Sequence, residues 1–186
     1  MVVLPAASGA VVYYVNDTGT ERRNKYLASI GQLKRIRLFE DLTDGMLEQI
    51  LPLAQEQSFA EREIIYEPGS EATHFYSLIT GKVLLQTELI PALIISIGAI
   101  KPGYSFGWSA FLPDLAHTSL AVCMEPCEIM VMPGDKFKAL LNQDHNIGFL
   151  VMQKTATILE NRLERRTAQF VKVITKHPDI ATLLGL

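Results

Sequence analysis

The sequence predicts a mainly β protein with flanking helices: an antiparallel β-roll (a double-stranded β-helix, jelly-roll-like), with N-terminal helices before it and a long C-terminal dimerisation helix after it. Three observations carry this prediction. Between residues 59 and 132, short runs of β-branched and aromatic residues alternate with glycine and proline turns. Residues 43–53 carry apolar side chains at helical spacing. Residues 149–173 hold a heptad pattern.

Composition sets the size and class of the protein. The chain has 186 residues, of which 48% are hydrophobic and 20% charged, with a formal net charge of −3. This length and hydrophobic content are typical of one domain with a hydrophobic core. The negative net charge does not favour direct binding to nucleic acid. Cys123 and Cys127 cannot build a disulfide framework, and we interpret them as small apolar residues in a reducing cytoplasm. The apolar runs at residues 1–15 and 89–100 are shorter than the ~20 residues of a membrane helix.

We expect three segments along the chain: a lead-in over residues 1–34, the β-roll with its helices over residues 35–142, and a long helix with its tail over residues 143–186. The basic residues between Glu21 and Arg37 are typical of a solvated helix face. Thr43 is the expected N-cap of the first well-patterned helix.

The β-roll is expected to form from six short runs separated by turns. Each run is rich in branched or aromatic residues and short enough for a strand. In chain order they are EIIYE, HFYSLI, KVLLQTEL, ALIISI, SLAVCM and EIMVM. After the last run, Asp135 is the expected N-cap of a short helix.

The final helix carries an apolar seam with spacings of 3, 4, 3, 4, 3, 4 and 3 residues. A seam held over three heptads favours pairing with an equivalent helix, although packing on its own domain is the alternative. We therefore expect a homodimer through this helix, which should end before Pro178. The expected interface residues are Phe149, Met152, Ala156, Leu159, Leu163 and Phe170, and the seam also includes Arg166 and Val173.

The order of these elements resembles the cyclic nucleotide-binding domain family, in particular the sensor domain of catabolite-activator-like (Crp/Fnr) regulators. The resemblance covers roughly residues 35–175. It rests on four stretches taken together: LFEDLTDGMLEQIL (38–51), EREIIYEPGSEATHFYSLITGKV (61–83), PGYSFG (102–107) and CEIMVMPGDKFKALL (127–141).

The resemblance implies a phosphate-binding cassette after PGYSFG. In the family this cassette reads Phe-Gly-Glu, followed about ten residues later by Arg-Ser/Thr-Ala. Its backbone N–H groups and its arginine bind the cyclic phosphate, while its glutamate binds the ribose hydroxyl. Here Trp108 replaces the glutamate and His117 the arginine. The candidate cassette residues are Tyr104, Phe106, Gly107, Trp108, Ser109, Ala110, His117, Thr118 and Ser119.

The functional prediction is a dimeric, cytoplasmic sensor or regulatory module that binds cAMP and cGMP weakly or not at all. Trp108 is interpreted as a packing plug or an aromatic ligand contact, and His117 as a hydrogen-bonded loop residue or an anion contact. The expected partner is a small-molecule effector, either a cyclic nucleotide or another anion. No metal, other cofactor or membrane contact is expected.

Three other functions are weighed against this one. A degenerate, ligand-free scaffold or protein-binding module is the main alternative. Direct DNA binding is not expected unless the chain is truncated, because it ends before the helix-turn-helix that the family's regulators carry. Catalysis is not expected, because no metal-ligand cluster, Ser/His/Asp set or carboxylate pair is recognisable.

Overall fold

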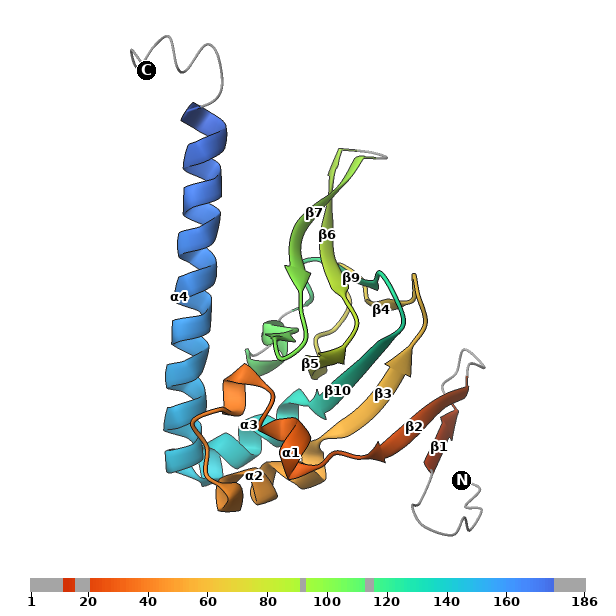
Figure 1. The fold of residues 1–186 in the computed structure, drawn as a ribbon, viewed down its shortest axis with the longest axis vertical. Coiled ribbons are helices and arrows are strands. Elements are labelled where there is room, and N and C mark those ends of the chain that lie inside the picture. Colours follow the sequence, from red (N-terminus) through yellow and green to blue (C-terminus); the bar gives the residue numbers. More distant parts are fainter. Residues whose placement is uncertain (1–11, 16–20, 91–92, 113–115, 176–186) are drawn as a thin grey trace.

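Two antiparallel sheets form the body of the molecule, and a long helix rises beside it (Figure 1). The structure, a computed structural model, describes residues 12–15, 21–90, 93–112 and 116–175. These two sheets, with short N-terminal helices and a long C-terminal helix, confirm the predicted fold class.

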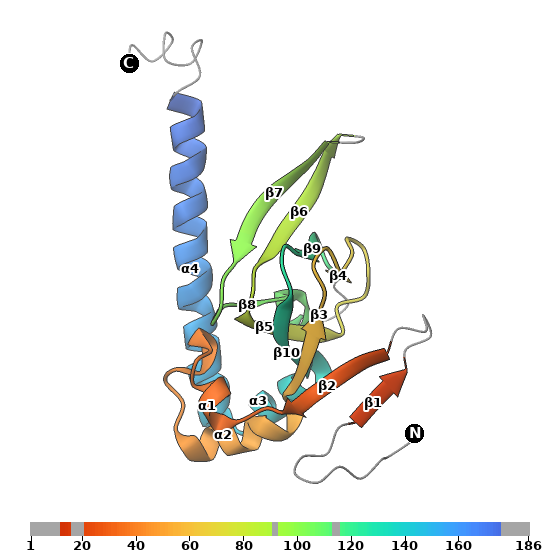
Figure 2. The same cartoon turned by 45° about the vertical axis from the view of Figure 1, so that its right-hand side comes forward.

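The first sheet has the strand order β1-β2-β3-β10-β5-β8. Its last four strands belong to the β-roll, and the β1–β2 hairpin extends the sheet beyond β3 (Figure 2). The strands are β1 (Val12–Val15), β2 (Glu21–Leu27), β3 (Gln55–Phe59), β5 (His74–Thr80), β8 (Ser105–Phe106) and β10 (Cys127–Pro133).

The second sheet has the strand order β4-β9-β6-β7. Its longest strands, β6 and β7, form a hairpin that projects from the body in the same direction as the long helix in both views (Figures 1 and 2). The strands are β4 (Ile64–Tyr66), β6 (Val83–Ile90), β7 (Leu93–Ile100) and β9 (Leu120–Cys123).

Strand β10 divides the hydrophobic core in two. Its side chains alternate, as a strand buried on both faces requires. Ile129 and Val131 face the interior of the β-roll together with Phe106. Met130 and Met132 face a second cluster that is built with the helices. The side chain of Phe106 in β8, the edge strand of the first sheet, therefore points into the interior of the roll.

The helices enclose one end of the roll. Thr43 accepts a hydrogen bond from the N–H of Met46 and caps the helix α2, which confirms the predicted cap. The helical elements before the roll are α1 (Ile30–Leu33), η1 (Arg37–Phe39), α2 (Asp44–Ile50) and η2 (Leu51–Leu53). Those within and after it are η3 (Trp108–Phe111), α3 (Gly134–Gln143) and α4 (His145–Thr175).

Helix α4 presents two faces with different surroundings. Asp144 accepts hydrogen bonds from the N–H groups of Asn146 and Ile147 at its start, at 3.0 and 3.1 Å. One face of its first half packs on the body and is buried at Ile147, Val151 and Thr155. The predicted interface residues lie on another face and are all exposed. The alternative that these six apolar residues pack on their own domain is therefore wrong.

Two local predictions are wrong. Residues 21–27 of the basic stretch form strand β2 rather than a helix, because they pair with β1 and β3. Helix α3 begins two residues earlier than expected, with Pro133 rather than Asp135 at the N-cap and Asp135 in the first turn. Gly134, the first residue of the helix, lies so close to the carbonyl of Ala110 that it has no room for a side chain.

Candidate ligand-binding cassette

The cassette begins where β8 ends, and its first turn requires a glycine. Phe106 pairs with Tyr76 of β5 and is fully buried. Gly107 follows with a φ of 75°, in the left-handed region. A Cβ atom on Gly107 would lie 2.7 Å from the ring of Tyr76. The backbone turn that the family resemblance implies is therefore present, and the sequence enters η3 directly after it.

Trp108, at the start of η3, packs among aromatic rings. Its ring centroid lies 5.2 Å from that of Phe75 and 6.0 Å from that of Phe111, in edge-to-face geometry at both contacts. Its Nε1 atom is buried and has no hydrogen-bond partner within the described chain. The indole of Trp108 therefore fills space between Phe75 and Phe111, at the position where the resemblance implies a glutamate.

His117 is buried, with 4% of its surface exposed, and its ring lies flat against Tyr66. The two centroids are 3.6 Å apart and the planes are 7° from parallel. Burial lowers the pKa of the imidazole from its ordinary value. A neutral, stacked histidine cannot supply the charge that an arginine gives to a cyclic phosphate.

Tyr66 anchors this stack from strand β4. Its ring also contacts those of Tyr76 and Phe106, at 5.7 and 6.1 Å. Burial raises the pKa of its phenol to about 12, against a side-chain hydrogen bond with Ser119 that lowers it. The loop holding His117 is fixed as well, because its N–H donates to the carbonyl of Ser70 at 2.9 Å. These contacts hold the buried ring of His117 in place against Tyr66.

The other candidate residues do not converge on one point. Thr118 is exposed and Ser109 half-buried, while Ala110 packs against the start of α3. Tyr104 lies outside the cassette and carries the guanidinium of Arg37 over its ring, 4.6 Å from the centroid. Ala110 lines one surface hollow, and Tyr104 lines two others. These two residues therefore do not share a pocket.

Sequence reasoning missed two residues that shape the cassette, Tyr66 and Arg162. Arg162 reaches across from α4 and donates from Nη2 to the carbonyl of Ser105 at 2.7 Å. Its guanidinium carbon lies 5.5 Å from the centroid of the Trp108 ring. The sequence did contain a sign of this contact. Arg162 follows Val151 and Thr155 at spacings that place all three on one face of the helix, and the first two are buried against the body.

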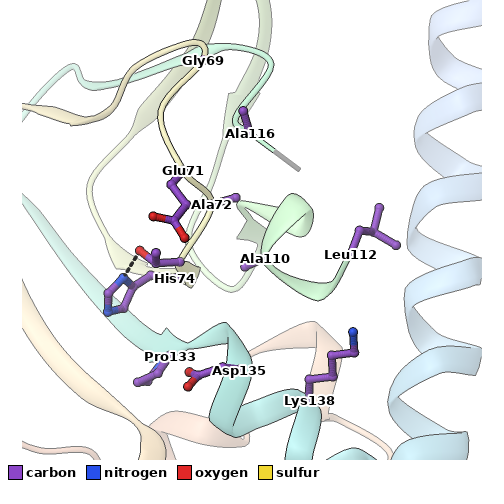
Figure 3. A pocket seen from close by; sticks show the side chains of 11 residues that line it. Gly69, Glu71, Ala72, His74, Ala110, Leu112, Ala116, Pro133, Asp135 and Lys138 are labelled. Atoms are coloured by element: carbon purple, nitrogen blue, oxygen red, sulfur yellow. Dashed lines mark hydrogen bonds between the residues drawn. The ribbon is translucent and has the colours of Figure 1, made fainter. Parts of the chain in front are cut away.

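A separate groove of about 870 Å³ lies between the turn before β5, η3 and the start of α3 (Figure 3). His74, Glu71, Asp135 and Lys138 border it, and Nδ1 of His74 lies 2.8 Å from the hydroxyl of Thr73. Its charges are mixed in sign. Within the described ranges, no group of three His, Cys, Asp or Glu side chains is arranged to hold a metal ion.

Comparison with known proteins identifies a family model. Residues 56–144 match the model of the cyclic nucleotide-binding domain. A Rhodopseudomonas palustris protein, provisionally named a potassium channel protein, is 25% identical over 143 residues, or 77% of this chain and 33% of that protein. The chain thus spans about a third of the length of this curated relative. No helix in the described part of the chain is long and apolar enough to cross a membrane.

Solved structures share the fold. A Geobacter metallireducens protein, provisionally described as a cyclic nucleotide-binding protein, superposes with a TM-score of 0.65 at 25% identity, covering 73% of this chain and 98% of that one. The catabolite activator protein of Thermus thermophilus superposes with a TM-score of 0.63 at 21% identity, covering 74% and 62%. The second likeness concerns the fold alone.

Proposed function

Because this chain carries a cyclic nucleotide-binding domain, with residues 56–144 matching the family model, we propose that it is a non-catalytic regulatory module that binds cAMP and cGMP weakly or not at all. The observation that carries this proposal is the stack of His117 on Tyr66. It places a neutral ring where the resemblance implies a phosphate-binding arginine. Trp108, packed on Phe75, replaces the ribose-binding glutamate.

The size of the effect follows from the two missing contacts. A hydrogen bond to a charged group contributes about 1.5–3 kcal/mol. Loss of both contacts therefore weakens binding by about two to four powers of ten. Of the phosphate contacts that the resemblance implies, the backbone N–H groups at the Gly107 turn remain, and we expect these alone to give weak binding at most.

Calorimetric titration of the full chain with cAMP and cGMP tests this proposal. We expect no saturable binding at micromolar concentrations of either nucleotide. A complex with a Kd in the micromolar range or tighter would contradict it. Trp108→Ala, titrated in parallel, tests whether the indole alone excludes the ligand.

We further propose that the module is a homodimer joined through α4. The support is the exposure of the seam: Phe149, Leu163 and Phe170 are each about two-thirds exposed, at 67%, 68% and 66%. A row of apolar side chains this exposed, repeated at heptad spacing, favours a second copy of the same helix as its cover.

Leu163→Glu tests the dimer by placing charges in the middle of the seam. We expect the variant to sediment as a monomer where the unaltered chain sediments as a dimer. Ala168→Glu is the matched control, because it adds the same charge to the same helix at an exposed position about 140° around the helix from Leu163. Equal sedimentation of Leu163→Glu and the control as dimers would contradict the seam as the interface.

The match to a third of a longer protein named for potassium conduction is consistent with a regulatory module that serves different effector proteins. Two regulatory modes follow from the closed cassette. The module either responds to an effector that binds outside the cassette or acts as a scaffold for a partner protein. The filled cassette favours both modes over a response to cyclic nucleotides.

A further inference from the structure

We propose that strand β1 is an interaction edge that pairs with β1 of a second copy of this chain. β1 is the outermost strand of the first sheet and, within the described ranges, it pairs with β2 alone. The backbone N–H and C=O groups along its other side are therefore placed to hydrogen-bond with a further strand. This interface lies outside the cassette, and it goes beyond the regulatory function proposed above.

The residues of β1 do not oppose such pairing. Edge strands usually carry a charged residue, a proline or a bulge that keeps other strands away. β1 reads VYYV, with no charge and no proline, and its four pairs with β2 run without a shift in register. The charged residues of the hairpin lie in the inner strand, which reads ERRNKYL. The usual placement of charge on the outer strand is thus reversed.

The sequence of β1 is complementary to itself. Two copies related by a two-fold axis pair antiparallel, which makes the interface the same on both sides. Residues opposite each other in an antiparallel pair orient their N–H and C=O groups alike, so the residue at the axis faces its own copy. With either Tyr13 or Tyr14 at the axis, the pairs within β1 are tyrosine with tyrosine and tyrosine with valine. Aromatic pairs and aromatic pairs with β-branched residues are favourable across strands, which supports a second copy as the partner.

The position of β1 allows this pairing while α4 is engaged elsewhere. The β1–β2 hairpin and α4 lie on opposite sides of the body in both views (Figures 1 and 2). A homodimer joined through α4 would therefore leave the β1 edge of each copy accessible, and pairing at β1 would link one dimer to the next. With four residues from each copy, the contact is smaller than the about 1,000 Å² of a stable interface, so we expect it at high protein concentration.

Residues 1–11 of the same chain are the competing partner for this edge. They directly precede β1 and begin with the apolar run MVVLPAA. A strand formed by these residues along β1 would exclude a second copy from the edge. The experiment below therefore includes a variant that lacks them.

Sedimentation of the full-length Leu163→Glu variant, from micromolar to millimolar concentration, tests the pairing apart from the α4 seam. We expect association to increase with concentration, and amide hydrogen exchange at residues 12–15 to slow as it does. Adding Tyr13→Glu/Tyr14→Glu should weaken this association about tenfold or more, because a glutamate then faces its own copy in either register. The hairpin should be kept, since both positions lie opposite arginines of β2, Arg23 and Arg22, where a glutamate is favourable.

Lys136→Glu in the same Leu163→Glu chain is the matched control, because it changes the net charge equally at an exposed position of α3. It should associate as Leu163→Glu alone does. Equal association of the double glutamate variant and this control, or no association at millimolar concentration, would overturn the proposal. So would association that appears only once residues 1–11 are removed, which would assign the edge to the chain's own first residues. None of these results depends on whether α4 forms a dimer or cAMP binds.

Discussion

Restoring the two charged cassette residues should create a cyclic-nucleotide site. The variant Trp108→Glu/His117→Arg introduces a carboxylate after Gly107 and a guanidinium at the position that now stacks on Tyr66. The new carboxylate would lie near the guanidinium of Arg162, which already lies over the Trp108 ring. The backbone turn at Gly107, with its φ of 75°, needs no change.

The expected gain can be worked from these contacts. Two charge-assisted hydrogen bonds contribute about 3–6 kcal/mol together. Loss of the stack between His117 and Tyr66 lowers the stability of the fold by about 0.5–1.5 kcal/mol, in the free and the bound variant alike. The two new bonds therefore correspond to a gain in cAMP affinity of about two to four powers of ten.

Calorimetric titration with cAMP, after circular dichroism has confirmed folding, is the assay. Trp108→Gln/His117→Gln is the matched control: it changes both positions without restoring either charge, and it should gain nothing. A folded charged variant with no more affinity than this control would refute the reasoning, because it would mean that the missing charges are not what prevents binding.

Three further predictions concern closely packed residues of the cassette and of the helices. Because burial lowers the pKa of His117, the unfolded chain takes up a proton more readily than the folded chain. The free energy of unfolding should therefore fall as the pH drops below about 6.5, by at most about 1.4 kcal/mol per pH unit. Urea titrations should show a smaller fall in His117→Phe than in the unaltered chain. His74, whose pKa burial also lowers, leaves a fall of the same sign in that variant. Gly148→Ala would press a methyl group into the carbonyl of Leu141 between α3 and α4 and should cost about 1–3 kcal/mol in thermal unfolding; an unchanged melting temperature would count against this contact. Trp108→Phe removes the unpaired Nε1–H and should stay within about 1 kcal/mol of the original stability, whereas Trp108→Ala should lose about 3 kcal/mol; equal losses would contradict the plug role of the ring.

The strands that could be predicted from the sequence are those that are themselves rich in β-branched and aromatic residues. The run HFYSLI is buried through most of β5, and its β-branched and aromatic character is a local property. Strand β3, QEQSF, is largely polar and becomes a strand because it pairs with β10. Strand β8 has two residues, too few for any pattern. Strand β2 reads as a basic helix face until its pairing with β1 and β3 is known.

The residues of the candidate site also fall into those that the local sequence predicts and those that depend on distant contacts. Gly107 was predictable because its turn depends on the glycine itself. The state of His117 was not, since it is decided by Tyr66, which lies 51 positions earlier. The two residues meet through the pairing of β4 with β9 and through the backbone hydrogen bonds of His117 with Gly69 and Ser70. Arg162 was missed for a similar reason: its contact with Ser105 joins residues 57 positions apart. Such contacts arise from tertiary packing rather than local sequence.

Helix α4 also has a mechanical consequence. Beyond Arg166, whose guanidinium holds β7, nine further residues extend to Thr175 as an arm of about 14 Å. A rotation of about 10° at Arg166 would move the end of this arm by about 2 Å. A small change at the contact between Arg166 and β7 is therefore amplified toward the end of α4.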